Sequence, residues 1–227
     1  GAIEVVVAFP FRAGFAALKF PGHWPRPRKS ERTTMEVRTV DVVSRVLKFW
    51  YDEDALDLAA DGDYRMAWFK KDNAFDEAIR DQFEADVRSA ANGNLDDLKE
   101  TAAGVLALCI LLDQFPRNLY RGLPQAFATD LIALAIAKGA IDRGLDQELG
   151  KTRRMFLYLP FEHSENLDNQ NTSVELFKAS NDEQSYRYAL EHYYVISRFG
   201  RFPGRNAALG RESSEEEIRF LEEFGAY

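Results

Sequence analysis

A segment near the C-terminus alternates arginines with aromatic residues and glycines. Its arginines are Arg198, Arg201, Arg205 and Arg211, and Asn206 lies between the last two. Guanidinium groups are forked donors that match a carboxylate or a phosphate, and the segment leads into a predicted helix N-terminus, whose free N–H groups also favour an anion. The segment therefore indicates a site for a small anionic ligand.

The alternative is that these arginines pair with carboxylates of the chain itself and fix its loops. The acids considered for this pairing are Asp113, Glu162, Glu165 and Asp168. A chain with an excess of acidic residues has many carboxylates to neutralise, so ligand binding and internal pairing can both hold.

An acid and an amide stand at the end of a long apolar stretch. Asp113 and Gln114 follow two leucines, and Arg117 and Asn118 come directly after Pro116. An unpaired charge is costly at a partly buried helix end, so these polar groups need partners. Because Asp113 and Arg117 are four residues apart, we favour a pair within the helix or its closing turn over direct contact with a ligand.

A histidine lies between two carboxylates in the segment Glu162-His163-Ser164-Glu165. A histidine bonded to a carboxylate is a candidate general acid or base, and His192 is the second such candidate. A metal site would need Asp113, Glu162 or Glu165 as further ligands, and the spacing is not that of a helical HExxH zinc site. We predict no metal and no cofactor, and whether the protein is an enzyme stays open.

Composition restricts the partners. The chain of 227 residues is 46% hydrophobic and 29% charged, which is typical of one main globular domain. Its net charge of -8 argues against nucleic acid or an anionic membrane as partner, since both need a basic surface.

The apolar stretch from Ala102 to Leu112 is too short to span a bilayer and contains the single cysteine, Cys109. Cys109 is expected to be a buried structural thiol, and the absence of disulfides suits the cytoplasm.

Residues 1–35 differ from the rest of the chain. An apolar run from Val5 to Phe9 is followed by three prolines that exclude a continuous helix. Basic residues follow the apolar run, whereas a secretory signal has them in front, and they are few for a nucleic-acid arm. We expect an accessory extension, irregular or partly extended, or upstream sequence read through from an earlier start, ahead of an all-helical domain over residues 36–227.

Helical spacing of apolar residues predicts the elements that position these groups. The first amphipathic helix is expected from Val40 to Tyr51, followed by a turn at residues 61–63. The second carries Phe75, Ile79, Phe83 and Val87 and stops at residues 92–94. A central helix apolar on nearly all sides starts near Asp96 and ends close to Phe115, because Pro116 disfavours helix in the residue before it. Arg117, Asn118 and Arg121 then fall in a turn.

Further helices are expected in the second half. They cover residues 124–140, 152–158 up to Pro160, 174–177 and 186–199. Ser213 and Glu216 have the spacing of a capping box before a last helix. No strand alternation of useful length occurs, so we predict an all-α fold of roughly eight short helices stacked as hairpins.

Several segments together resemble one bacterial family. They are Val46 to Trp50, Leu112 to Asn118, Ala126 to Asp130, Phe156 to Glu165 and Arg198 to Pro203. In this order, from about Val40 to the C-terminus, they are similar to the family called domain of unknown function 924. The resemblance implies a tetratricopeptide-like fold, with antiparallel helix pairs stacked into a compact right-handed solenoid, and no established activity. It also leads us to expect a histidine between Pro203 and Arg205, where this chain has Gly204.

Two hypotheses follow. In the first, the helix ends converge on one polar pocket, where Arg117, Arg198, Arg201 and Arg205 hold a small anionic molecule. Asp113, Glu162 and Glu165 orient these arginines, and His163 or His192 transfers protons if there is catalysis. In the second, a concave helical groove binds a peptide or protein partner through exposed tyrosines. The candidates for that groove are Tyr186, Tyr188, Tyr193 and Tyr194.

Overall fold

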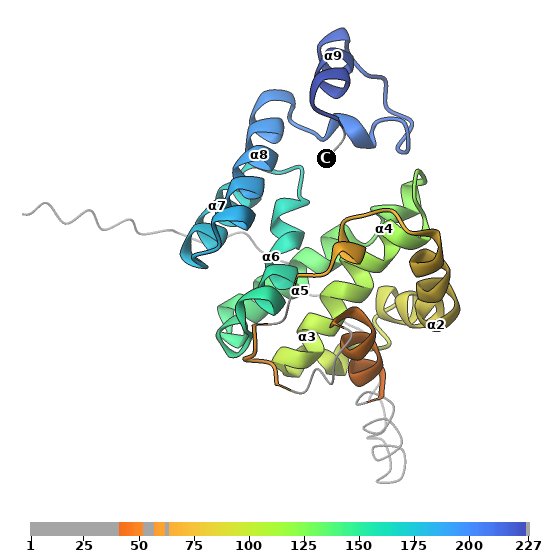
Figure 1. The fold of residues 1–227 in the computed structure, drawn as a ribbon, viewed down its shortest axis with the longest axis vertical. Helices are drawn as coiled ribbons and strands as arrows, with labels where there is room; N and C mark the ends of the chain where they lie inside the picture. Colours follow the sequence, from red (N-terminus) through yellow and green to blue (C-terminus); the bar gives the residue numbers. More distant parts are fainter. Residues whose placement is uncertain (1–40, 52–56, 62–63, 226–227) are drawn as a thin grey trace, which may run out of the picture.

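The computed structural model of the chain describes residues 41–51, 57–61 and 64–225. Within these ranges no β-strand occurs, and the all-α prediction is confirmed (Figure 1). Residues 41–51 are helical, followed by α2 (Asn73–Ala91), α3 (Ala102–Cys109), α4 (Phe115–Leu119), α5 (Asp130–Asp142), α6 (Lys151–Glu162), α7 (Leu167–Ala179), α8 (Glu183–Phe199) and α9 (Glu215–Phe224). The extension predicted over residues 1–35, the start of the first helix at Val40, and Gly62 and Asp63 of the predicted turn lie outside the described residues.

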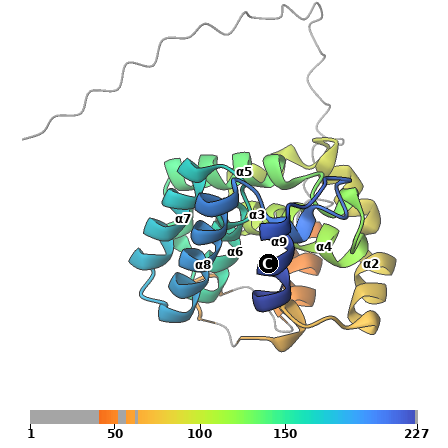
Figure 2. The same cartoon turned by 90° about the horizontal axis from the view of Figure 1, so that it is seen from above.

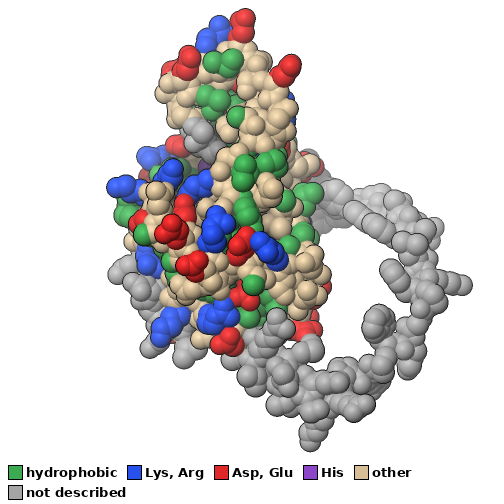
Figure 3. Space-filling view, turned by 90° about the vertical axis from the view of Figure 1, so that its right-hand side faces the viewer, with side chains coloured by type: hydrophobic (Ala, Val, Ile, Leu, Met, Phe, Trp, Pro, Cys, Tyr) green, Lys and Arg blue, Asp and Glu red, His purple; other side chains and the backbone are tan. Residues whose placement is uncertain are grey.

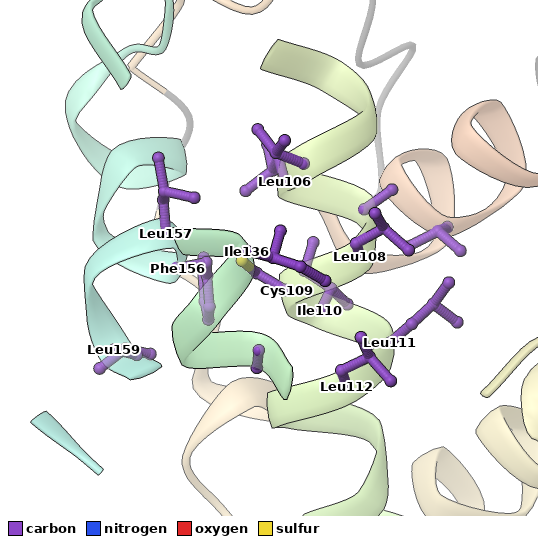
Figure 4. Packing of buried hydrophobic residues seen from close by; sticks show 14 of the residues in the cluster. Leu106, Leu108, Cys109, Ile110, Leu111, Leu112, Ile136, Phe156, Leu157 and Leu159 are labelled. Atoms are coloured by element: carbon purple, nitrogen blue, oxygen red, sulfur yellow. The ribbon is translucent and has the colours of Figure 1, made fainter. Parts of the chain in front are cut away.

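The predicted central helix is confirmed as the middle of the core, but it begins at Ala102 and not near Asp96. Residues Asp96–Glu100 form a separate 3₁₀ turn, and Thr101 is extended and caps α3 by accepting from the Gly104 N–H. Side chains from Leu106 to Leu112 are at most 1% exposed, with Cys109 among them. Ile136 of α5 and Phe156 of α6 lie alongside them in Figure 4. Because each fully buried leucine or isoleucine contributes about 1.5–3 kcal/mol, this stretch is a large source of stability. It also ends in the polar residues that the sequence singles out.

The prediction that this helix ends close to Phe115 is wrong, as is the placing of Arg117 and Asn118 in a turn. Residues Ile110–Gln114 form one π-helical turn, η3, in which the Phe115 N–H bonds to the Ile110 carbonyl, and α4 continues directly from it. Arg117 and Asn118 are therefore helical, and Arg121 lies in the turn beyond, as predicted.

A side chain from another element allows the helix to pass Pro116. Proline has no N–H, so it cannot bond to the Leu112 carbonyl four residues earlier. The Thr129 hydroxyl donates to that carbonyl instead, at 2.5 Å. A buried backbone acceptor is thus satisfied from the start of α5, which fixes α5 against η3.

The prediction that the helix over residues 152–158 ends before Pro160 is also wrong. α6 continues past Pro160 to Glu162 and closes where the His163 N–H bonds to the Leu159 carbonyl at 2.9 Å. A proline inside a helix costs about 3 kcal/mol. Burial of Leu159 and Phe161 offsets it, at about 1.5–3 kcal/mol each.

Two further boundaries differ from expectation. The helix predicted over residues 124–140 is divided into the 3₁₀ turn η4 (Pro124–Ala126) and α5, because i to i+3 bonds hold residues 123–130 in tight turns. The capping box of α9 is formed by Ser214 and Glu217, one residue later than predicted. The Ser213 hydroxyl is instead engaged by Asn206 Nδ2 at 3.0 Å.

The C-terminal helices enclose a second, smaller core. α6, α7 and α8 pack in succession, and α9 lies against the 3₁₀ turn η6 (Pro203–Arg205), as the two views in Figures 1 and 2 show. Val195, Ile196, Phe202 and Phe220 form the buried cluster under α9. The arrangement confirms a packed all-helical protein, while the right-handed solenoid stays a prediction. Among the described residues, no helix is long and apolar enough to cross a membrane.

Replacement of Thr129 tests the bond that allows the helix past Pro116. In Thr129→Val the Leu112 carbonyl stays buried without a donor, so we expect the free energy of unfolding to fall by about 1–3 kcal/mol. Thr129→Ser keeps the hydroxyl and is the matched control. The Thr129 side chain makes no capping hydrogen bond to α5, so loss of a helix cap cannot explain a difference in stability between the two variants. Equal losses in the two variants, measured by urea unfolding, would contradict the role of the hydroxyl.

Candidate functional site

A cavity of about 260 Å³ lies between the start of α5, the end of α6 and the loop after α8. Its polar wall consists of Asp130, His163, Ser164, Glu165 and Arg205. Phe127, Leu131, Leu134, Pro160 and Leu209 are among its apolar residues. A water molecule occupies about 30 Å³ in the liquid, so the cavity has room for a small organic ligand.

His163 reaches the cavity from the end of α6 and is fixed by a buried acid. Its Nδ1 lies 2.9 and 2.8 Å from the two carboxylate oxygens of Asp113, which is 0% exposed. Asp113 also accepts from Gln114 Nε2 at 2.5 Å and pairs with Arg117 at 3.3 Å. Burial alone raises the pKa of Asp113, yet the charges of Arg117 and His163 bring it to about 2. The predicted pair of Asp113 with Arg117 is confirmed.

The state of the imidazole follows from these contacts. Burial and the nearby Arg117 lower the pKa of His163, against the opposing effect of Asp113, so the ring is uncharged at neutral pH. An ionised carboxylate can only accept, so the ring proton lies on Nδ1 and the lone pair on Nε2. This Asp-oriented imidazole has the form of a general base.

Two guanidinium groups share one carboxylate in the wall of the cavity. Arg117 donates to both oxygens of Asp130, at 2.9 and 3.1 Å. Arg205 donates to Asp130 Oδ2 at 3.1 Å and to the His163 carbonyl at 2.9 Å. Each arginine therefore has only part of a counter-charge from Asp130.

Arg205 is held in an aromatic setting. Its guanidinium carbon lies 4.7 Å from the ring centroid of Phe127 and 4.6 Å from that of Phe202. Burial and the neighbouring Arg117 charge lower the pKa of Arg205 to about 10, so it stays charged at neutral pH. It is 8% exposed as a whole residue. The geometry thus presents a rigid cation at the edge of the cavity.

Glu165 connects the end of α6 to the loop after α8. It accepts from the Phe202 N–H at 2.8 Å and from Arg211 at 2.7 and 2.9 Å. Arg211 in turn donates to Asn206 Oδ1 at 2.9 Å. Burial alone raises the pKa of Glu165, but Arg211 and the Phe202 N–H lower it. Arg211 therefore pairs with a carboxylate of the chain itself, which is the alternative to ligand binding that the sequence analysis considers.

A second histidine–carboxylate pair lies next to His163. The ring centroid of His192 is 6.4 Å from that of His163, and its Nδ1 is 2.9 Å from the Tyr188 carbonyl and 3.5 Å from Glu162 Oε1. Glu162 Oε2 is buried without a hydrogen-bond partner among the described residues. Burial raises the pKa of Glu162 to about 8 and lowers that of His192 to about 4. At neutral pH both are uncharged, and neither lines the cavity.

Of the predicted ligand-binding residues, Glu165 and Arg205 line the cavity and the others do not. Three of the others, Arg198, Arg201 and Asn118, pair with residues outside the site. Arg198 pairs with Glu216 at 2.7 Å and Arg201 with Glu217 at 2.6 Å, so both fasten α9. Asn118 donates to Asp76 of α2 at 2.7 Å. The expectation that these arginines join Arg117 and Arg205 at one ligand is therefore corrected, because the first turn of α9 supplies carboxylates within their reach.

Two smaller expectations are also corrected. Glu162, predicted to orient a guanidinium, lies beside His192, since its position at the end of α6 turns it toward α8. Asp168, considered as an arginine partner, is exposed in the first turn of α7.

Asp130 and Phe127 are site residues that the sequence reasoning missed. Both lie in the segment Ala126 to Asp130, which contributes to the family resemblance but was given no role. An acidic residue in the first turn of a helix ordinarily indicates a favourable contact with the helix dipole. Its pairing with Arg117 and Arg205 depends on the tertiary arrangement, since Arg205 is 75 residues away in sequence.

The remaining candidates do not add to the site. Gly204 lies in η6 beside Arg205 and is not among the cavity residues. Tyr188 and Tyr194 are 39% and 51% exposed, while Tyr186 and Tyr193 are half-buried.

Among the described residues, no group of three or more histidine, cysteine, aspartate or glutamate side chains is placed to hold a metal ion. Acidic and basic side chains are interspersed on the face in Figure 3.

Comparisons with known proteins identify relatives that are described as proteins of unknown function. Residues 46–225 match the family described as "Bacterial protein of unknown function (DUF924)". The solved structure of the protein of unknown function ATU0120 from Agrobacterium tumefaciens is 39% identical, and the match covers 82% of this chain and 99% of that one with a TM-score of 0.73. No curated protein matches.

Glu162 makes stability depend on pH in an unusual direction. Its folded-state pKa of about 8 lies above the value near 4.3 of an unfolded glutamate, so its contribution to stability is full below about pH 4 and is lost as pH rises toward 8. Glutamine cannot titrate. Between about pH 5 and pH 8, we expect wild type to lose roughly 2–4 kcal/mol of unfolding free energy relative to Glu162→Gln.

Urea unfolding at a series of pH values measures this difference. Glu175→Gln, at an exposed position in the middle of α7, is the control and should follow wild type. Parallel pH dependence of wild type and Glu162→Gln would show that Glu162 is ionised in the folded protein.

Proposed function

Because the chain belongs to the family of bacterial proteins of unknown function DUF924, whose description gives no activity, its role must be derived from its own site. We propose that the cavity binds a small molecule that carries one carboxylate on an apolar body. One observation carries the proposal: a charged and buried guanidinium, that of Arg205, stands in the wall of a cavity whose other walls are mainly apolar.

Arg205 has further N–H groups that can donate to a ligand. Its hydrogen bonds to described residues go to Asp130 and to the His163 carbonyl, and a guanidinium has further N–H groups in the same plane. Since Asp130 also serves Arg117, the charge of Arg205 is only partly neutralised. A hydrogen bond from such a group to an anionic oxygen contributes about 1.5–3 kcal/mol.

The charge balance supports a single carboxylate over a phosphate. The charged groups of the site are Arg117, Arg205, Arg211, Asp113, Asp130 and Glu165. These three cations and three anions cancel, and His163 is uncharged. A dianion would place two further negative charges beside Asp130 and Glu165, both of which face the cavity.

The rest of the wall indicates the body of the ligand. Leu134, Pro160 and Leu209 offer no hydrogen bond from their side chains, and Leu131 at the rim is 78% exposed. A short aliphatic or aromatic group would cover these apolar surfaces and gain about 25 cal/mol per Å² removed from water.

Binding of butyrate and benzoate tests the proposal directly. We expect wild type to bind both, and to bind inorganic phosphate more weakly, in isothermal titration calorimetry. Arg205→Lys keeps the charge but loses the planar fork, and affinity for benzoate should fall by roughly 10-fold or more. Arg198→Lys is the matched control, because Arg198 also pairs with a carboxylate and lies over aromatic rings, but away from the cavity.

A second pair of variants leaves Arg205 in place. Leu131→Glu adds a negative charge at the exposed rim and should weaken benzoate binding, whereas Leu123→Glu, at a 50% exposed position that does not line the cavity, should not. Equal binding by wild type and both the Arg205 and Leu131 variants would place the ligand elsewhere.

Carboxylate binding should also take up a proton. An anion on Arg205 leaves the site with one excess negative charge, which raises the pKa of His163 and favours its charged form. Affinity for benzoate is therefore expected to rise as pH falls through the range in which free His163 titrates. Calorimetry in buffers of different ionisation enthalpy measures the proton uptake, and its absence would separate His163 from the ligand.

A further inference from the structure

We propose that the cavity hydrolyses small uncharged carboxylic esters, with His163 as the general base that activates a water molecule and Arg205 as the donor to the oxyanion. This inference rests on the proposed function, since the carboxylate held by Arg205 is then the product of the reaction. It adds an activity and a substrate class to the binding site.

The base and the oxyanion donor are adjacent. Arg205 donates to the backbone carbonyl of His163 at 2.9 Å, and both residues line the same cavity. The imidazole cannot turn freely, because both oxygens of Asp113 lie within 2.9 Å of its Nδ1. Asp113 is itself held by Gln114 and Arg117. Such preorganised geometry reduces the cost of bringing base, water and carbonyl together.

The electrostatics favour a neutral substrate. The resting site contains equal numbers of guanidinium and carboxylate groups and a neutral imidazole. In the transition state, His163 becomes positive next to Asp113, while the ester oxygen becomes negative next to Arg205. The reaction therefore separates one pair of charges onto two positions that are already complementary, and the net charge of the site does not change.

Water is the nucleophile that the surrounding residues leave available. Ser164 lines the cavity, but its hydroxyl accepts from Asn169 Nδ2 at 2.8 Å and from the Asn166 N–H at 3.3 Å in the turn before α7. Its bonds to described residues do not include His163. Cys109 is fully buried in α3, and burial raises the pKa of its thiol far above neutrality.

The steps balance without an additional reagent. Water attacks the carbonyl carbon, its proton passes to His163 Nε2, and the carbonyl electron pair moves to the oxygen beside Arg205. The tetrahedral intermediate collapses as the bond to the alkoxy oxygen breaks, and His163 returns the proton to that oxygen. The products are an alcohol and a carboxylic acid, which releases its proton and stays as the carboxylate on Arg205.

Hydrolysis of p-nitrophenyl butyrate by the full chain tests the inference. We expect turnover with kcat/KM that rises with pH and levels off above the pKa of His163, that is, with a midpoint below about pH 6.5. Both His163→Ala and Asp113→Asn should reduce kcat/KM at least about 100-fold. Arg198→Lys should retain the wild-type rate, because Arg198 lies away from the cavity.

A rescue experiment separates chemistry from folding. If His163→Ala melts at a lower temperature than wild type, His163→Gly supplemented with imidazole should recover part of the rate, which a purely structural histidine would not allow. Butyrate should inhibit wild type competitively, because it occupies the position of the product.

The outcomes distinguish the two proposals. Binding of butyrate together with a rate of ester hydrolysis equal to that of His163→Ala would overturn the hydrolase and leave the binding site standing. Absence of butyrate binding, together with absence of turnover, would overturn both. Turnover that depends on His163 but not on Asp113 or Arg205 would also contradict the mechanism.

Discussion

The site depends on one buried charge, the carboxylate of Asp113. It lies on the π turn of the most buried helix and is 0% exposed, so it is stable only with strong partners. Arg117 from α4 and His163 from the end of α6 provide the charge and the hydrogen bonds that it needs. Arg117 also pairs with Asp130 at the start of α5, and Asp130 pairs in turn with Arg205 from the loop after α8. Contacts that begin at one acidic residue thus connect the π turn to α4, α5, α6 and the loop after α8.

Two prolines lie inside the helices that supply these groups, and both leave a backbone carbonyl without its helical partner. For Pro116 the consequence is visible, because the Thr129 hydroxyl takes the place of the missing donor and brings the first turn of α5 to the site. Pro160 lines the cavity two residues before the end of α6. Irregular backbone is concentrated where polar side chains must converge, and π turns are frequent at functional sites for the same reason.

Much of the fold could be predicted because it depends on apolar periodicity. The central helix, α2 and α8 follow from residues such as Phe83 and Ile196, whose burial is set by their helical spacing. The passage of helix through Pro116 and Pro160 could not be predicted, since it depends on tertiary contacts. The site was predicted in part: Asp113, Arg117, His163, Glu165 and Arg205 converge as expected. Arg198 and Arg201 have the same local sequence character as Arg205, and only the position of α9 separates them.

The protonation states of the two histidine–carboxylate pairs suggest a division of tasks. In the pair of His163 with Asp113, the acid is ionised and the base is neutral, so the imidazole can take up a proton next to a charge that stabilises it. In the pair of His192 with Glu162, both groups are neutral, and an oxygen of Glu162 stays buried without a partner. The ring of His192 lies 6.4 Å from that of His163, and because neither His192 nor Glu162 is charged at neutral pH, this second pair adds no charge beside Asp113 and Arg205.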